Sequence, residues 1–279
     1  MEFGITAMNS GAAVTAESTV ELSRLAEEAG YTTWWASDHV VLPTKLGPDS
    51  PMPSGDPIMD PLVHLTYVAA VTEKLKLATG IVILPQRNPL VLAKQVASLD
   101  VLSGGRLALG VGAGYLEPEM TAVGVPMATR GKRTDEYLDA MTELWTSPAP
   151  SFQGEFVSFT DIDAHPRPVR PGGPRIVIGG NSPAAYRRAV ARGHVWFGIG
   201  SYDDLVGHLA GLKRAAARGD RPARLGELEV NFLPMPFLPG AGEVRRYEDL
   251  GVKQLVLYPR SVEDPGGAKE FLRRHAELI

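Results

Sequence analysis

Hydrophobic and polar positions follow two alternating rhythms along the chain. Short apolar runs rich in β-branched and aromatic residues predict buried strands, and the segments between them carry apolar residues at helical spacing. In the segment 15–29, for example, Leu22, Leu25 and Ala26 lie on one apolar stripe, and Gly30 follows as a helix stop. Strands are expected at 2–8, 32–37, 75–84, 106–111, 175–178, 194–199, 229–233 and 254–258.

Helices fill the intervals between these strands. They are expected at 15–29, 61–72, 89–102, 132–145, from 183 onwards, and at 202–217, 242–250 and 267–277. Strands that alternate with helices form a parallel sheet. Because eight strands alternate with eight helices, we expect a closed (β/α)8 TIM barrel of the α/β class and not an open doubly wound sheet. The whole chain, 1–279, is expected to be one domain, with an irregular insertion at about 147–174.

Composition and charge exclude several classes of protein. The chain is 44% hydrophobic and 22% charged with a formal net charge of −4, and it has no basic block interleaved with aromatics. A nucleic-acid partner is therefore not expected, and Arg187, Arg188 and Arg192 are expected to lie on a solvated helix face. The absence of cysteine excludes disulfides, thiolate metal sites and a cysteine nucleophile.

No segment predicts a targeting signal or a membrane anchor. The longest apolar run, 77–84, is far shorter than the ~20 residues of a membrane helix. The first residues show no basic region followed by an apolar one, so a signal peptide is not expected. We therefore expect a cytoplasmic protein with no membrane partner.

Barrels of this class carry their binding and catalytic groups on the loops that follow the strands. The second strand is followed by Ser37, Asp38 and His39, which would place an imidazole in the barrel mouth with a carboxylate to fix its tautomer. The alternative is a structural or capping pair. A metal site is not expected, because the chain has no His-x-His pair and its other histidines are scattered.

Glycines mark the third and fourth strands. Gly80 inside a buried strand permits a bulge or a close backbone approach, either to a flat ligand or as a packing compromise. The run 110–115 carries alternate glycines, which clear space above the barrel. It matches neither a phosphate P-loop nor a dinucleotide fingerprint.

The turn after the fifth strand is the strongest local signal. Gly179 and Gly180 free the backbone, Ser182 can cap the following helix, and Pro183 suits the first helical position. Such a helix start presents unpaired N–H groups and a partial positive charge, which favours a phosphate. The alternative is an ordinary strand-to-helix turn.

These features predict a backbone-lined slot, a phosphate cradle and one imidazole in the barrel mouth. The sequence shows no paired catalytic carboxylates, nucleophile elbow or metal cluster. A site with so little reactive chemistry of its own implies that a cofactor supplies it.

Several motifs carry a resemblance to a known family. They are Ser-Asp-His at 37–39, Leu-Ala-Thr-Gly-Ile at 77–81, Pro-Gln-Arg-Asn-Pro at 85–89, Ala-Lys-Gln at 93–95, the segment 98–106, the segment 109–115 with Glu119, and the Gly-Gly turn at 179–180. Together they resemble the luciferase-like monooxygenase family, whose members are barrel oxidoreductases that use FMN or the deazaflavin coenzyme F420.

The resemblance implies roles for individual residues. The ring of the cofactor would lie against the third strand, where relatives often have a bulge with a non-proline cis peptide, and Asp38 would contact the polar edge of the ring. His39 would be the acid or base beside the substrate, and Glu119 is a second catalytic candidate or a structural residue. The further cofactor-binding residues would be Thr79, Gly80, Ile81, Gly112, Ala113, Gly114, Tyr115, Gly179, Gly180, Asn181 and Ser182.

The resemblance also implies a reaction, a hydride transfer between F420 and a small organic substrate. The alternatives are an FMN-dependent monooxygenase supplied by a separate reductase, and a non-catalytic flavin-binding barrel. Tyr115 stands where certain sugar-phosphate dehydrogenases of the family have an acid, so a sugar phosphate is not expected. Relatives often form homodimers through helices beside the second and third strands, here the segment 61–71. The segments 40–58 and 147–174 are expected to shape the substrate pocket.

Overall fold

The protein folds as a closed barrel of parallel strands in a computed structural model that describes residues 1–11, 14–45, 47, 50–259 and 264–279. The strands of the barrel are β1 (Glu2–Ile5), β2 (Thr33–Ala36), β3 (Lys76–Thr79), β4 (Val82–Ile83), β5 (Leu107–Gly112), β8 (Arg175–Gly179), β9 (Val195–Gly200), β10 (Glu229–Pro234) and β11 (Val252–Leu257). β1 pairs with both β2 and β11, and β3 pairs with both β2 and β5, so the ring closes. The predicted TIM barrel is confirmed.

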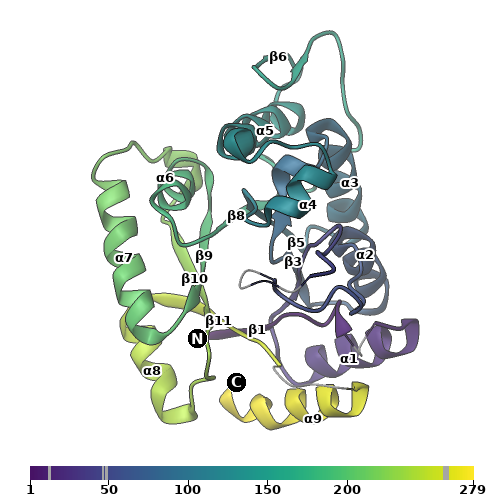
Figure 1. The fold of residues 1–279 in the computed structure, drawn as a ribbon, viewed down its shortest axis with the longest axis vertical. Helices are drawn as coiled ribbons and strands as arrows, with labels where there is room; N and C mark the ends of the chain where they lie inside the picture. The colour runs from purple at the N-terminus through teal and green to yellow at the C-terminus, as the bar shows by residue number, and fades with distance from the viewer. Residues whose placement is uncertain (12–13, 46, 48–49, 260–263) are drawn as a thin grey trace.

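Helices surround the ring of strands (Figure 1). They are α1 (Ala16–Glu28), α2 (Pro61–Val71), α3 (Pro89–Leu102), α4 (Glu117–Ala122), α5 (Arg130–Thr146), α6 (Pro183–Arg192), α7 (Tyr202–Ala216), α8 (Ala241–Asp249) and α9 (Pro265–His275). The helices α2, α3, α6 and α9 begin alike, with a capping side chain followed by proline. The cap accepts hydrogen bonds from the first free N–H groups, and proline has no N–H to satisfy, so these starts are readable in the sequence.

The third predicted strand, 75–84, is not continuous. It forms β3 and β4, with Gly80 and Ile81 between them and a cis peptide bond joining these two residues. The N–H of Gly80 donates to the carbonyl of Ala36 at 2.7 Å. On the other side β5 comes so close that a Cβ at Gly110 would collide with the carbonyl oxygen of Thr79. The bulge and the cis peptide expected here are confirmed, and the uninterrupted strand is wrong.

The interior of the barrel is filled by apolar side chains. Trp35 lies at its centre and stacks on Phe197, with the two ring centroids 4.8 Å apart. All four residues of β2 are buried, because alternate side chains point into the barrel and outward against the helices. Further buried residues of the interior are Ala78, Val177, Val195, Leu233 and Val256.

The insertion 147–174 carries a hairpin of β6 (Phe152–Gln153) and β7 (Ser158–Phe159). Glu136 on α5 holds it by accepting hydrogen bonds from the N–H groups of residues 155–157 at 2.7–2.9 Å. Because α5 runs back from the carboxyl ends of the strands, the insertion lies at their amino ends, where Arg170 and Pro174 line a cavity. The expectation that this segment shapes the pocket in the barrel mouth is therefore wrong.

The outer face of α2 carries apolar side chains. Leu62 and Leu65 are buried against the barrel, but Val63 and Tyr67 on the other side are 70% and 44% exposed. The homodimer expected through 61–71 stays a prediction. In the part of the chain that the structure describes, no helix is both long and apolar enough to cross a membrane.

Candidate active site

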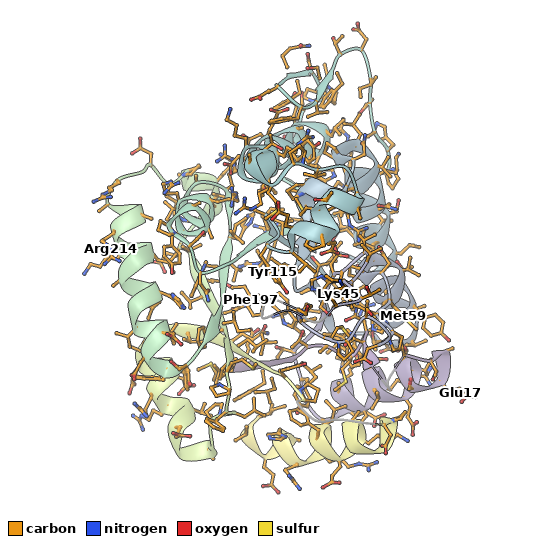
Figure 2. All side chains as sticks on the ribbon, viewed as in Figure 1. Glu17, Lys45, Met59, Tyr115, Phe197 and Arg214 are labelled. Atoms are coloured by element: carbon orange, nitrogen blue, oxygen red, sulfur yellow. The ribbon has the colours of Figure 1, made fainter. Side chains whose placement is uncertain are left out.

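A cavity of about 640 Å³ lies at the carboxyl ends of the barrel strands. Its walls come from the segments after β2, β3, β5 and β8 and from the start of α5. Most of the predicted site residues line it, including Tyr115, which Figure 2 labels. The predicted residues in the wall are Asp38, His39, Gly80, Ile81, Gly112, Ala113, Gly114, Tyr115, Gly179, Gly180 and Ser182.

Three predicted residues, Thr79, Asn181 and Glu119, do not line the cavity. The hydroxyl of Thr79 is fully buried and exchanges two hydrogen bonds with the backbone of Gly110, at 2.7 and 2.8 Å. Asn181 is exposed, and its amide donates to the carbonyl of Ile199 at 2.7 Å. In this structure Thr79 joins β3 to β5, and Asn181 joins the turn after β8 to β9.

Glu119 lies behind the wall and holds His39. Nδ1 of His39 is 3.0 Å from Oε2 of Glu119, and the two side chains are 11% and 0% exposed. Oε1 of Glu119 accepts a hydrogen bond from the N–H of Val40 at 2.6 Å. Burial raises the pKa of Glu119, but the hydrogen bond and charge of His39, together with hydrogen bonds from Val40 N–H and Gln86, outweigh burial and lower it overall. An ionised carboxylate can only accept a hydrogen bond, so Nδ1 of His39 must carry the proton that it donates to Glu119. Nε2 of His39 is therefore the nitrogen that is left to exchange a proton with a substrate.

The helix that delivers Glu119, α4, was not predicted from the sequence. Its six residues are too few to show an amphipathic period, and they lie in a segment expected to be a loop. Met120 on α4 packs in a small core with Ile83, which fixes the helix over the barrel mouth. Tyr115 precedes α4 and meets the ring of His39 edge to face, with the centroids 6.2 Å apart.

Asp38 lies in the cavity wall, but both oxygens of its carboxylate accept hydrogen bonds from other residues of the protein. Oδ2 accepts from the N–H of Ile83 at 3.0 Å, and Oδ1 accepts from Arg87 at 2.8 Å. Arg87 also donates to Asp60 at 2.8 Å. Burial lowers the pKa of Arg87, but the two carboxylates outweigh burial and raise it. Asp38 therefore braces the bulged strand, and its contact with the polar edge of a ring stays a prediction.

The glycines around the cavity make room for one side chain, that of Ile81. A Cβ at Gly112 would collide with Cδ1 of Ile81, and a Cβ at Gly179 would lie 2.7 Å from the same atom. Ile81 can therefore fold down onto β5 and β8. The sequence suggested that the alternate glycines of 110–115 clear space above the barrel, whereas here Gly112, together with Gly179, clears space for the bulge.

The start of α6 forms a positive end of the cavity. Ser182 caps the helix, as predicted, by accepting a hydrogen bond from the N–H of Ala185 at 3.2 Å. Pro183 has no N–H, and the N–H of Ala184 has no hydrogen-bond partner among the described residues. A free N–H at the positive end of the helix dipole favours an anion at this point.

Two arginines that the sequence did not predict as site residues, Arg130 and Arg188, line the same end of the cavity. Arg130 begins α5, and Arg188 lies on α6, where Nε donates to Asp135 at 2.7 Å. Only 6% of Arg188 is exposed, so the solvated face expected for it is wrong. The helical period offered a signal, because Ala184, Ala185 and Arg188 share one face of α6.

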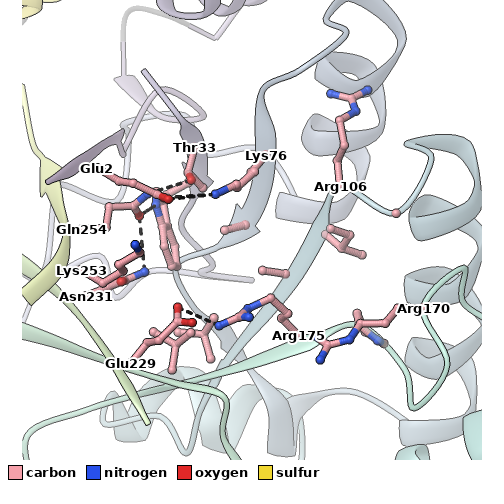
Figure 3. Close-up of a pocket in the computed structure, with 18 of the residues that line it drawn as sticks. Glu2, Thr33, Lys76, Arg106, Arg170, Arg175, Glu229, Asn231, Lys253 and Gln254 are labelled. Atoms are coloured by element: carbon pink, nitrogen blue, oxygen red, sulfur yellow. Dashed lines mark hydrogen bonds and ion pairs between the residues drawn. The ribbon is translucent and has the colours of Figure 1, made fainter. Parts of the chain in front are cut away.

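A second cavity, of about 390 Å³, lies at the amino ends of the strands (Figure 3). Four of its charged side chains form two ion pairs: Glu2 with Lys76 at 3.1 Å, and Glu229 with Arg175 at 2.8 Å. Gln254 accepts from Trp35 at 3.0 Å, which satisfies the buried indole. Paired groups at this end of a barrel indicate a role in stability.

The described residues contain no group of three or more histidine, aspartate or glutamate side chains that could hold a metal ion. The chemistry available in the mouth of the barrel is therefore one imidazole, a backbone slot and a positive end.

Comparisons with known proteins show the family of the chain. The sequence profile described as luciferase-like monooxygenase matches residues 1–233. An uncharacterised protein of Mycobacterium tuberculosis (strain ATCC 25618 / H37Rv) is 30% identical, over 98% of this chain and 97% of its own length. The FMNH2-dependent dimethylsulfone monooxygenase of Pseudomonas putida is 32% identical, over 56% of this chain and 44% of its own.

Solved structures show the same fold. The structure of an F420-dependent secondary alcohol dehydrogenase in complex with an F420–acetone adduct superposes with a TM-score of 0.78 at 16% identity, over 100% of this chain and 98% of that chain. The profile covers well over half of the chain, and a relative at 30% identity covers nearly all of it. The chain therefore belongs to the luciferase-like monooxygenase family.

Proposed function

We propose that this protein is an F420-dependent oxidoreductase that transfers a hydride between the deazaflavin and a small organic substrate. The observation that carries the proposal is the buried His39–Glu119 pair beside the cavity. The other groups in the cavity wall are suited to binding a cofactor and not to proton transfer. Bound F420 would supply the carbon that gives or takes the hydride.

The cavity fits a flat ring joined to a phosphate. Its volume of about 640 Å³ lies within the range of small-molecule and cofactor sites, about 300–1,000 Å³. At one side the backbone of Gly80 and Ile81 would support the ring. At the other, Ser182, Arg130 and Arg188 would hold the phosphate, since a capped helix start and two guanidinium groups favour an anion.

The residues of the chain would position the substrate and move a proton. His39 would give or take the proton that accompanies hydride transfer, through Nε2, because Glu119 holds Nδ1 in its protonated form. Tyr115, beside His39, would cover the substrate and exclude water. These residues would position the substrate against the ring and exclude water, which hydride transfer requires.

The alternative is an FMN-dependent monooxygenase, supported by the relative of Pseudomonas putida whose name states dependence on FMNH2. The same positive end would hold the phosphate of FMN. The segment Ser37-Asp38-His39, through its resemblance to deazaflavin enzymes, favours F420. A non-catalytic barrel is disfavoured, because a buried carboxylate that fixes one nitrogen of an imidazole beside an open cavity has no evident structural role.

Two substitutions separate catalysis from binding. Substrates are first found by screening small alcohols, ketones and unsaturated compounds for a change in F420 absorbance. We expect His39→Ala to slow turnover about 10²–10⁴-fold while F420 affinity changes less than about threefold. We expect Arg130→Gln to weaken F420 binding about three- to tenfold.

The matched control is Lys132→Gln, one half-turn along α5, because Lys132 is exposed and does not line the cavity. It should leave binding and turnover unchanged. Full turnover by His39→Ala would show that His39 is not the acid or base.

A further inference from the structure

A small groove lies on the far side of α6 from the cavity. It has a volume of about 190 Å³, and its floor is formed by Tyr186 and Gly211, which pack against each other where α6 meets α7. Three arginines surround it: Arg187 on α6, Arg214 on α7, and Arg218 just after α7. Arg214 projects into solvent at the edge of the molecule (Figure 2).

These three arginines have no counter-ion among the described residues. Within the described part of the chain, none of their guanidinium groups has a hydrogen bond or an ion pair, and no carboxylate lines the groove. The other arginines of α6 differ: Arg188 pairs with Asp135 and Arg192 with Asp139, each at 2.7 Å. Three positive charges in one groove repel one another, and a bound anion would relieve that repulsion.

The groove and the cavity share the first turn of α6. Ser182, Ala184 and Ala185 lie in the wall of the cavity, and Pro183 and Arg187 lie in the wall of the groove. A chain that leaves a phosphate at Ser182 and passes over Pro183 would enter the groove within one turn of helix, a rise of about 5 Å.

We propose that the groove binds the carboxylates of the cofactor's tail. This inference rests on the proposed function, because F420 continues beyond its phosphate into a lactyl group and γ-linked glutamates, whereas FMN ends at its phosphate. Each γ-linked glutamate adds a carboxylate that a guanidinium recognises with paired hydrogen bonds. The groove would therefore distinguish the two cofactors.

The tail length of the ligand tests this proposal. Dissociation constants are measured by fluorescence at low ionic strength for F420 with several glutamates, for the same deazaflavin phosphate without glutamates, and for FMN. An exposed ion pair contributes about a two- to fivefold gain in affinity, so three should give the tailed form about a tenfold advantage or more. That advantage should shrink as salt is added.

Substitution locates the effect. We expect the triple variant Arg187→Gln, Arg214→Gln and Arg218→Gln to lose the advantage of the tailed form while it binds the tailless form as the wild type does. Arg245→Gln on α8, an exposed arginine that forms no ion pair with the described residues, is the control and should keep the advantage. All four positions are exposed, and equal thermal midpoints would show that each variant is folded.

Three results would overturn the inference. If wild-type protein binds the tailed and tailless forms equally, the groove does not hold the tail, although the proposed function stands. If the triple variant weakens both forms alike, the arginines act on the phosphate or on the fold. If neither deazaflavin binds, both the inference and the proposed function fail.

Discussion

The imidazole of His39 suits proton transfer because Glu119 holds it in one tautomer. The carboxylate accepts from Val40 N–H and from His39 Nδ1, so both of its oxygens are used. This pairing joins residues 80 positions apart. The sequence identified both residues as candidates through a resemblance, but their contact depends on α4, which no local pattern predicts.

We expect Glu119→Gln to remove the base without removing the imidazole. The carboxamide oxygen must accept from Val40 N–H, so its NH2 group faces Nδ1 of His39 and forces the proton onto Nε2. Turnover should fall about 10²–10⁴-fold and its pH profile should change, while F420 affinity changes less than about threefold. Steady-state kinetics and fluorescence titration measure these effects.

Glu117→Gln is the control, because Glu117 lies in the same first turn of α4 and is exposed. It should behave like the wild type. A Glu119→Gln enzyme with wild-type turnover would show that the tautomer of His39 does not matter.

His64 should make stability depend on pH. It is buried on α2, its Nε2 accepts from Trp34 at 3.0 Å, and burial lowers its pKa from 6.5 to about 4. The unfolded chain takes up the proton near pH 6.5, whereas the folded protein does so only near pH 4. His64 therefore contributes stability that is fully present above pH 6.5 and is lost as pH falls toward 4, by up to about 3 kcal/mol.

His64→Gln tests this, because the amide oxygen can still accept from Trp34. Denaturant unfolding between pH 7 and pH 4 should show a shallower loss of stability than in the wild type. Part of the slope should remain, because burial also lowers the pKa of His194 to about 4. His165→Gln, at an exposed site, should leave the slope as it is. Equal slopes for His64→Gln and wild type would contradict the assignment.

The burial of Arg188 is a property that the sequence alone does not predict. Its place on α6 followed from the pattern, but its burial depends on Asp135, which lies 53 residues away on α5. The cap at Ser182 was predictable because all of its contacts are local. Residues whose surroundings are local could be read from the sequence, and residues placed by distant helices could not.

At the scale of elements, the bulge between β3 and β4 sets the shape of the cavity. The backbone of Gly80 and Ile81 leaves the ladder, and the side chain of Ile81 fills the space left by Gly112 and Gly179. The period of the apolar run 75–84 predicted one strand, because the period does not show where pairing is interrupted. Gly80 was the local signal of the break.

Gly110→Ala should disrupt this element. The new Cβ would collide with the carbonyl oxygen of Thr79, which is backbone and cannot rotate away. We expect a loss of at least about 1–3 kcal/mol in the free energy of unfolding, with weaker cofactor binding. Denaturant unfolding and fluorescence titration measure the two effects.

Gly207→Ala is the matched control on α7, because a Cβ there meets nothing within 4 Å. It should raise stability by about 0.5–1 kcal/mol, since alanine favours a helix interior. If both variants are equally stable, the close approach of β5 to β3 does not constrain the barrel.

At the scale of the whole molecule, the two ends of the closed barrel have different roles: one end carries the candidate binding site and the other carries groups that stabilise the fold. The carboxyl ends of the strands carry the cavity, and the amino ends carry the paired charges of Figure 3. The count of eight strands predicted the closed ring, and the rule that sites follow strands predicted which loops matter. The insertion 147–174 lies at the other end of the barrel, because α5 starts at the carboxyl ends of the strands and leads the chain back to their amino ends.

The central claim is that the cavity binds F420, and a thermal titration tests it most directly. Purified protein is heated with oxidised F420 or with FMN, each at increasing concentration, and fluorescence gives the dissociation constants. At 100 times its dissociation constant a ligand adds about 2.7 kcal/mol of stability, which raises the midpoint of a chain of this size by about 5–10 °C. We predict such a saturable shift with F420 and none with FMN. A shift with FMN alone, or with neither cofactor, would contradict the account.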